Sequence, residues 1–68
     1  MIQIQDLKPE DVGRWVTYNK DPFEKHKGRI KTWNKEFIFV VYKCQGEWDR
    51  FLDYGAMATS PEDLDWQE

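Results

Sequence analysis

Residues 28–44 read GRIKTWNKEFIFVVYKC, and this stretch decides the fold. Two runs with the character of β-strands meet at Asn34-Lys35, and the second run, Phe37 to Tyr42, is apolar throughout. Aromatic and β-branched residues favour strands, and a strand that is apolar on both faces is covered on both. In so short a chain, the simplest cover is a small β-barrel or tightly rolled sheet that this strand crosses.

Weaker strand signals surround this hairpin. Residues 14–18 alternate as a first strand, residues 19–27 form a polar loop, and residues 50–54 read as a short fourth strand. Residues 64–66 return to the core or form a closing strand. The fold class predicted for residues 1–68 is all-β, a single small domain with five antiparallel strands.

Two one-turn helices are expected beside these strands. Pro9 and Pro61 each suit the first position of a helical turn, and acidic residues follow both prolines. Ser60 is placed to cap the second turn through its side chain. Gly13 can supply the left-handed residue that ends the first.

Charge is distributed unevenly along the chain, whose net charge is −3. Residues 1–13 have a net charge of −2, and residues 14–43 carry eight basic against three acidic side chains, a net of +5. Residues 44–68 carry one arginine against seven acids, a net of −6. Aromatic residues make up 16% of the chain, which compensates for the small core that 68 residues can build.

Cys44 is the only cysteine, so an internal disulfide and a CxxC zinc site are both excluded. A small secreted domain without a disulfide would be unusual, which favours a reducing compartment. The N-terminal residues show no signal peptide, and the longest apolar run has six residues, far fewer than the roughly 20 that span a bilayer. We therefore expect a cytoplasmic protein with Cys44 as a half-buried structural thiol.

Three segments carry a family resemblance: VGRWVTY at residues 12–18, KGRIKTWNKEFIFVVYKC at 27–44 and ATSPEDL at 58–64. Together they resemble the layout of small, mostly uncharacterised SH3-like proteins of phage and prophage genomes. The resemblance covers residues 7–65 and implies an SH3-like five-stranded barrel in the cytoplasm of a bacterial host. It brings no catalytic or binding residues with it. The spacing of the first two glycines also resembles, more weakly, Tudor and KOW-like barrels, which bind methylated side chains or nucleic acid.

Catalytic signatures are absent from the sequence. A Cys44–His26 dyad would pair the one cysteine with the one histidine, but no third group is suggested to orient it. The four glycines are dispersed, so the chain has no glycine-rich phosphate loop. We predict that the protein is not an enzyme and needs no metal or cofactor.

A surplus of aromatic residues favours binding to another protein. Eleven aromatic side chains exceed what so small a core hides, and exposed Trp and Tyr are typical interface anchors. The rings predicted to contact a partner are those beside turns and loops: Tyr18, Phe23, Trp33 and Trp48. The alternative is that these rings close the open ends of a barrel.

A nucleic-acid surface is the second hypothesis. Alternation over residues 28–33 places Arg29, Lys31 and Trp33 on one face, and further lysines of residues 25–35 flank them. Such a face can grip phosphates and stack a base. The sequence pI of about 5.1 argues against it, because nucleic-acid-binding domains are usually basic.

The sequence thus predicts a non-catalytic protein-binding module, with Arg29 and Lys31 also among its candidate partner-binding residues. The alternative function is nucleic-acid binding through the basic face of residues 25–35. A third idea, that the acidic residues of 44–68 imitate a nucleic acid on a host enzyme, is a special case of protein binding. The oligomeric state stays open.

Overall fold

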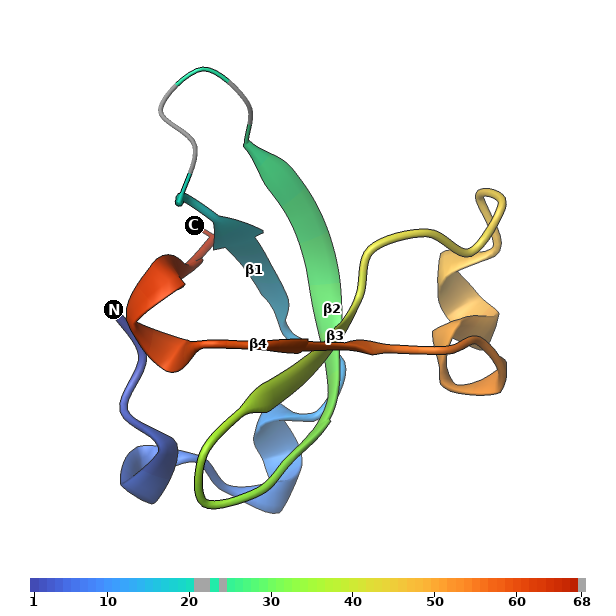
Figure 1. The fold of residues 1–68 in the computed structure, drawn as a ribbon. Helices are drawn as coiled ribbons and strands as arrows, with labels where there is room; N and C mark the ends of the chain where they lie inside the picture. The colour runs from blue at the N-terminus through green and yellow to red at the C-terminus, as the bar shows by residue number, and fades with distance from the viewer. Residues whose placement is uncertain (21–22, 24, 68) are drawn as a thin grey trace.

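The computed structural model describes residues 1–20, 23 and 25–67 of the chain (Figure 1). It consists of strands and short 3-10 helices, the latter written η. In chain order the elements are η1 (Ile4–Asp6), η2 (Pro9–Asp11), β1 (Trp15–Tyr18), β2 (His26–Trp33), β3 (Ile38–Val41), η3 (Trp48–Asp53), β4 (Met57–Thr59), η4 (Pro61–Asp63) and β5 (Leu64–Trp66). The predicted all-β class is confirmed.

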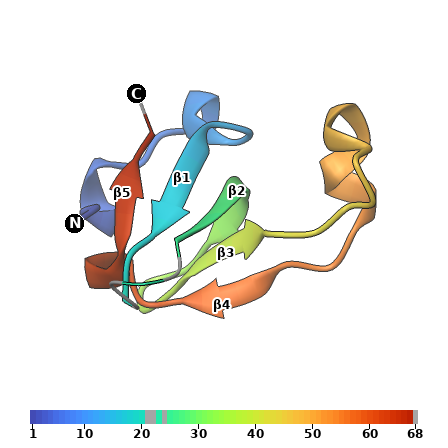
Figure 2. The ribbon, with the colours of Figure 1, turned by 90° about the horizontal axis from the view of Figure 1, so that it is seen from above.

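All five strands belong to one antiparallel sheet with the order β4-β3-β2-β1-β5. The long strand β2 lies at its centre, between β1 and β3. The strands β4 and β5 lie at the two ends of the curved sheet (Figure 2), and within the described residues they do not pair with each other. Five antiparallel strands are therefore present as predicted, but hydrogen bonds do not close them into a barrel.

A β-bulge interrupts the pairing of β2 with β3. Ile30 lies opposite Val40 and Thr32 lies opposite Phe39, so Lys31 has no partner in the ladder. One extra residue in a strand moves the side chains that follow it to the opposite face of the sheet. The simple alternation predicted for residues 28–33 therefore fails at this point.

Both faces of β3 are covered, as predicted for an apolar strand. Val40 belongs to the main core and Val41 to a second, smaller cluster, and both are fully buried. The main core is formed by buried residues of the N-terminal segment and of β1, β2, β3 and β5: Ile2, Val16, Ile30, Ile38, Val40 and Leu64. The second cluster joins Val41 to Cys44 and Phe51. The thiol of Cys44 is thus fully buried, where a half-buried one was expected.

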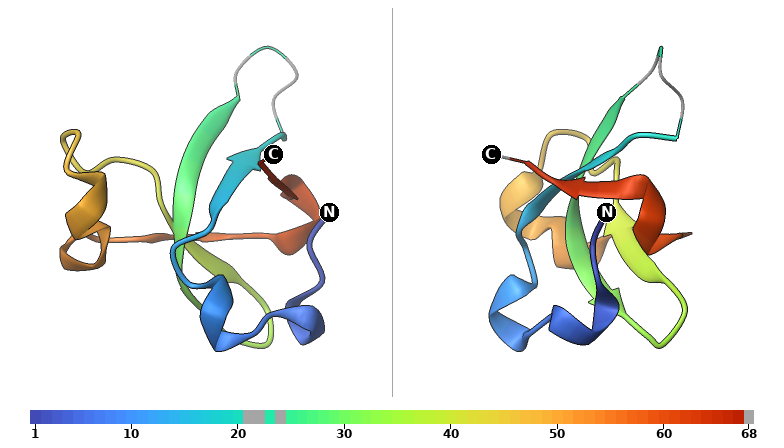
Figure 3. Two further views of the ribbon diagram at one scale, coloured as in Figure 1. Left: turned by 180° about the vertical axis from the view of Figure 1, so that it is seen from behind. Right: turned by 90° about the vertical axis from the view of Figure 1, so that its left-hand side faces the viewer.

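The segment between β3 and β4 provides the cover for the second face. Residues 50–54 were predicted as a strand, but they belong largely to η3, and the fourth strand is Met57–Thr59. The segment η3 consists of two short helical turns joined by a kink at Arg50, and Trp48 and Phe51 both pack in the second cluster. The neighbouring Leu52 is exposed, whereas Phe51 is buried. Figures 1 and 3 show η3 on the opposite side of the molecule from the N-terminus.

The two predicted helical turns at Pro9 and Pro61 are both present. The first is capped by Asp11, whose carboxylate accepts a hydrogen bond of 2.9 Å from the backbone N–H of Lys8. That bond, together with the Arg14 guanidinium, holds the pKa of Asp11 below its usual value. Gly13 follows with φ of 91°, as expected. The Ser60 side chain makes no capping hydrogen bond in η4, so that prediction was wrong.

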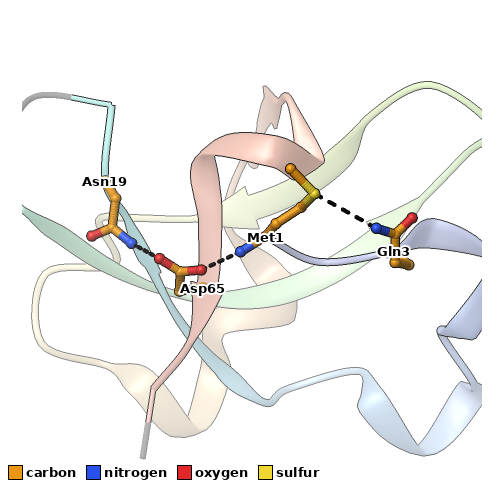
Figure 4. A network of polar contacts seen from close by, with 4 residues as sticks. All are labelled: Met1, Gln3, Asn19 and Asp65. Carbon is orange, nitrogen blue, oxygen red and sulfur yellow. Dashed lines mark hydrogen bonds and ion pairs between the residues drawn. The ribbon is translucent and has the colours of Figure 1, made fainter.

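Asp65 on β5 joins three separate parts of the chain (Figure 4). Its carboxylate pairs with the N-terminal ammonium of Met1 and accepts a hydrogen bond from the side-chain amide of Asn19. The backbone N–H of Ile2 donates to the carbonyl of Pro61 at 3.1 Å beside this network. The N-terminal ammonium is the main cause that lowers the pKa of Asp65.

Candidate functional site

A pocket of about 470 Å³ opens where β1 and β3 end, beside the start of β2 and along β4. Its aromatic lining comes from Tyr18, His26 and Tyr42, and Met57 supplies a flexible apolar side chain. The volume lies within the range of about 300–1,000 Å³ that is common for ligand sites. We call this site the Tyr18–Tyr42 pocket.

Two tyrosine rings of the lining contact each other. Tyr18 and Tyr42 meet edge to face, with ring centroids 6.2 Å apart and planes at 72°. Both pack on the main core, because Tyr18 shares its face of β1 with Val16 and Tyr42 follows Val40 by two residues. The His26 ring lies 6.4 Å from Tyr18 on the neighbouring strand.

Close approach between β2 and β3 sets the position of Tyr42. Gly28 lies so near β3 that a Cβ atom there would be 3.1 Å from the Tyr42 ring and 2.5 Å from a methyl group of Val40. Glycine is the one residue that fits this contact without displacement. The aromatic lining therefore depends on a residue that does not itself line the pocket.

The hydroxyl of Tyr42 is bound on β4. It lies 2.9 Å from the hydroxyl of Thr59, which itself donates to the carbonyl of Met57 at 3.3 Å. Burial is the main cause that raises the pKa of Tyr42. With its hydroxyl hydrogen-bonded in this way, the Tyr42 ring is held beside β4 and offers its apolar surface to the pocket.

Charged groups stand at the mouth of the pocket. Lys20 and Lys43, both exposed, extend from the ends of β1 and β3, and Asp63 is the carboxylate of the lining. The main chain at Asp63 is fixed, because its carbonyl accepts a hydrogen bond of 2.8 Å from the backbone N–H of Asn19. The site thus combines an apolar interior with a charged rim.

The structure places two of the predicted binding residues against η3. The Arg29 guanidinium donates from Nε to the carbonyl of Gly13 and from Nη1 to the carbonyl of Trp48, each at 2.7 Å. The ammonium of Lys31 donates to the carbonyl of Tyr54 at 2.8 Å. Because these residues lie at the start of η3 and just beyond its end, the two cations hold the helix onto the sheet from both sides.

Aromatic rings surround Arg29 on this side of the sheet. Its guanidinium lies 4.3 Å from the centroid of the Phe51 ring and 5.5 Å from that of Trp15. Trp48 packs against Trp15 with ring centroids 4.7 Å apart and planes tilted by 55°. Trp48 is half-buried in this arrangement, and Trp15 is 36% exposed.

The remaining predicted residues lie apart from each other. Trp33 pairs with Ile38 beyond the bulge and packs on the main core, so it does not share a face with Arg29. Phe23 lies in the loop between β1 and β2 and is 93% exposed. Residues 21, 22 and 24 of the predicted loop lie outside the described residues. Of the six predicted residues, Tyr18 is the one that lines the pocket.

Sequence reasoning missed the other members of the pocket, notably Tyr42, Met57 and Asp63. Tyr42 was predicted as part of the buried strand, although its place at the end of the apolar run was a signal that its ring lies where the strand ends. Met57 lies in a segment for which no strand was predicted, and Asp63 lies in the helical turn predicted at Pro61. Their approach to Tyr18 depends on strand pairing that local patterns do not encode.

No group of three or more His, Cys, Asp or Glu side chains suited to a metal ion occurs in the part of the chain that is described. Cys44 lies in the second cluster beneath η3, whereas His26 lines the pocket. Within the same residues, no helix has the length and apolar character needed to cross a membrane. Models of known protein families, curated proteins and solved structures give no significant match to the chain.

Proposed function

We propose that this chain is a non-catalytic protein-binding module that takes an extended segment of a partner in the Tyr18–Tyr42 pocket. The observation that carries the proposal is the pocket of about 470 Å³ that contains two tyrosine rings in edge-to-face contact, beside the end strand of the sheet. Rigid aromatic pockets are where interfaces concentrate their binding energy. A terminal strand also offers backbone groups to an extended peptide.

The strand order supports an SH3-like arrangement, since a helical turn precedes a last strand that pairs with the first. A module of this kind acts through its binding surface and needs no cofactor. Phage or prophage origin remains a prediction from the resemblance, and a cytoplasmic location remains a prediction from the sequence.

Selection of peptides from a random display library tests this function. Selected peptides should shift the NMR signals of Tyr18, Tyr42 and Met57 in the ¹⁵N- and ¹³C-labelled protein. Met57 is 66% exposed, so replacing it with glutamate should leave the fold intact while placing a charge in the apolar interior. Met57→Glu should therefore abolish peptide binding.

Leu52→Glu is the matched control for this substitution. Leu52 is also exposed, at 53%, but it lies on η3 and not in the pocket. It should bind the selected peptides as the unchanged protein does. Failure of the library to yield any binder, or equal effects of the two substitutions, would refute the assignment of function to this pocket.

Nucleic-acid binding is the second candidate, and the lysines at the pocket mouth favour a single strand over a duplex. A base can stack on a tyrosine ring while an ammonium group neutralises a phosphate. The face formed by residues 25–35 is less suited to this than the sequence implied, because Arg29 and Lys31 already donate to carbonyl groups. Oligothymidylate titrated at about 50 mM salt distinguishes this candidate.

A further inference from the structure

The rim of the Tyr18–Tyr42 pocket has an excess of positive charge. Lys20 and Lys43 reach it from the two strands that flank β2, and neither lysine forms an ion pair with a described residue. Asp63 is the carboxylate that faces them across the pocket. Two ammonium groups that pair with no described carboxylate, next to an apolar interior, favour a ligand that is anionic on its outside.

We propose that the segment bound in this pocket is acidic, with carboxylates on both sides of one apolar anchor side chain. This inference rests on the proposed function and specifies its ligand. The anchor packs against the rings of Tyr18 and Tyr42 and against Met57, where it leaves water. The flanking carboxylates lie at the rim and pair with Lys20 and Lys43.

Charge complementarity separates this ligand from the other classes. A basic or methylated-lysine segment would meet two lysines of its own sign, and the single carboxylate of Asp63 does not offset them. A nucleic acid is also anionic, but its affinity grows with the number of phosphates that are neutralised, so tight binding favours a row of several cations. Arg29 and Lys31, which would extend such a row, donate to carbonyl groups at η3 instead.

Three synthetic peptides test the inference directly. Each has one central leucine, flanked on both sides by glutamate, by glutamine or by lysine, and each is titrated into the ¹⁵N-labelled protein. The glutamate peptide should bind most tightly and the lysine peptide most weakly. The affinity of the glutamate peptide should fall as salt rises, because exposed charges are screened over about 10 Å at 0.1 M.

Charge reversal at the rim should act through the flanks of the peptide. Lys20→Glu and Lys43→Glu should each weaken the glutamate peptide by roughly twofold to tenfold, as for exposed ion pairs. Lys35→Glu is the matched control, since Lys35 is exposed in the turn between β2 and β3 and does not line the pocket. Asp63→Asn should tighten the same peptide by roughly twofold.

The outcomes separate the inference from the function on which it rests. If library peptides bind in the pocket but the lysine-flanked peptide binds as well as the glutamate one, the inference is wrong and the protein-binding function stands. If oligothymidylate displaces every peptide and binds more tightly, the ligand class is nucleic acid. If no probe and no library peptide shifts the pocket signals, both proposals fail.

Discussion

Replacing Gly28 with alanine is the sharpest perturbation that the packing suggests. The added Cβ would lie 2.5 Å from a methyl group of Val40 and 2.7 Å from the backbone oxygen of Val41. It would also meet the Tyr42 ring at 3.1 Å. The oxygen belongs to the strand backbone, so it cannot move aside as a flexible side chain would, and β2 and β3 must separate.

Overpacking of this kind costs about 1–3 kcal/mol, and the loss of a flexible glycine from the unfolded chain offsets at most about 1 kcal/mol. We expect Gly28→Ala to lower the free energy of unfolding by about 1–2 kcal/mol. For a domain of this size that is a fall in Tm of roughly 5–15 °C. Thermal and urea unfolding followed by circular dichroism measure both quantities. The proposed binding of peptides in the Tyr18–Tyr42 pocket should weaken as well, because the Tyr42 ring must shift.

Gly55→Ala is the control for chain entropy. A Cβ at Gly55 meets no atom within 4 Å, and the residue is not in the positive-φ region. This substitution should leave stability unchanged or raise it by about 0.4–1 kcal/mol. If Gly28→Ala is as stable as the unchanged protein, or no less stable than Gly55→Ala, the close approach of β2 to β3 is refuted.

Three other substitutions or reactions probe single contacts. Arg29→Lys cannot reach the carbonyls of Gly13 and Trp48 together, so urea unfolding should show a loss of about 1–3 kcal/mol; an unchanged midpoint would contradict the bridging role. Because the pKa of Asp65 is lowered in the folded protein, its carboxylate adds stability above the unfolded pKa of about 3.9, and this stability is lost as pH falls through the folded pKa. Asp65→Asn should therefore be less stable than the unchanged protein at neutral pH, and the difference should disappear in acid. A difference that does not depend on pH would contradict the ion pair. Cys44 is 1% exposed, so a thiol reagent should label it only as the protein opens, and labelling of the native protein at the rate of a free thiol would contradict its burial.

Local patterns predicted the hairpin and its central strand well. The apolar run from Phe37 to Tyr42 required cover on both faces, and Val40 and Val41 lie in different buried clusters. Hydrophobic pattern is enough for this conclusion because burial of alternate residues follows directly from strand geometry. The two Pro-Glu-Asp turns were predicted for the same reason, since the requirements of a first helical turn are local.

Register and covering segments were beyond such patterns. Trp33 moved to the core face because a single bulge at Lys31 shifted the pairing, and no turn residue marks that bulge in the sequence. Residues 50–54 were predicted as a strand, but η3 consists of two short helical turns joined by a kink at Arg50. Single turns of this length leave no periodicity in the sequence that distinguishes them from a short strand.

The candidate binding surface was hardest to predict, because charge counted along a sequence is not the charge that a partner would meet. Arg29 and Lys31 contribute to the basic excess of residues 14–43, yet both donate to backbone carbonyls at η3. Lys20 and Lys43 remain at the pocket mouth without an ion pair to any described residue. The cations that donate to backbone carbonyls are less available to a ligand than those that do not. The positive charge that a ligand would meet therefore lies beside Tyr18, and not on the face of residues 28–33 that alternation favoured.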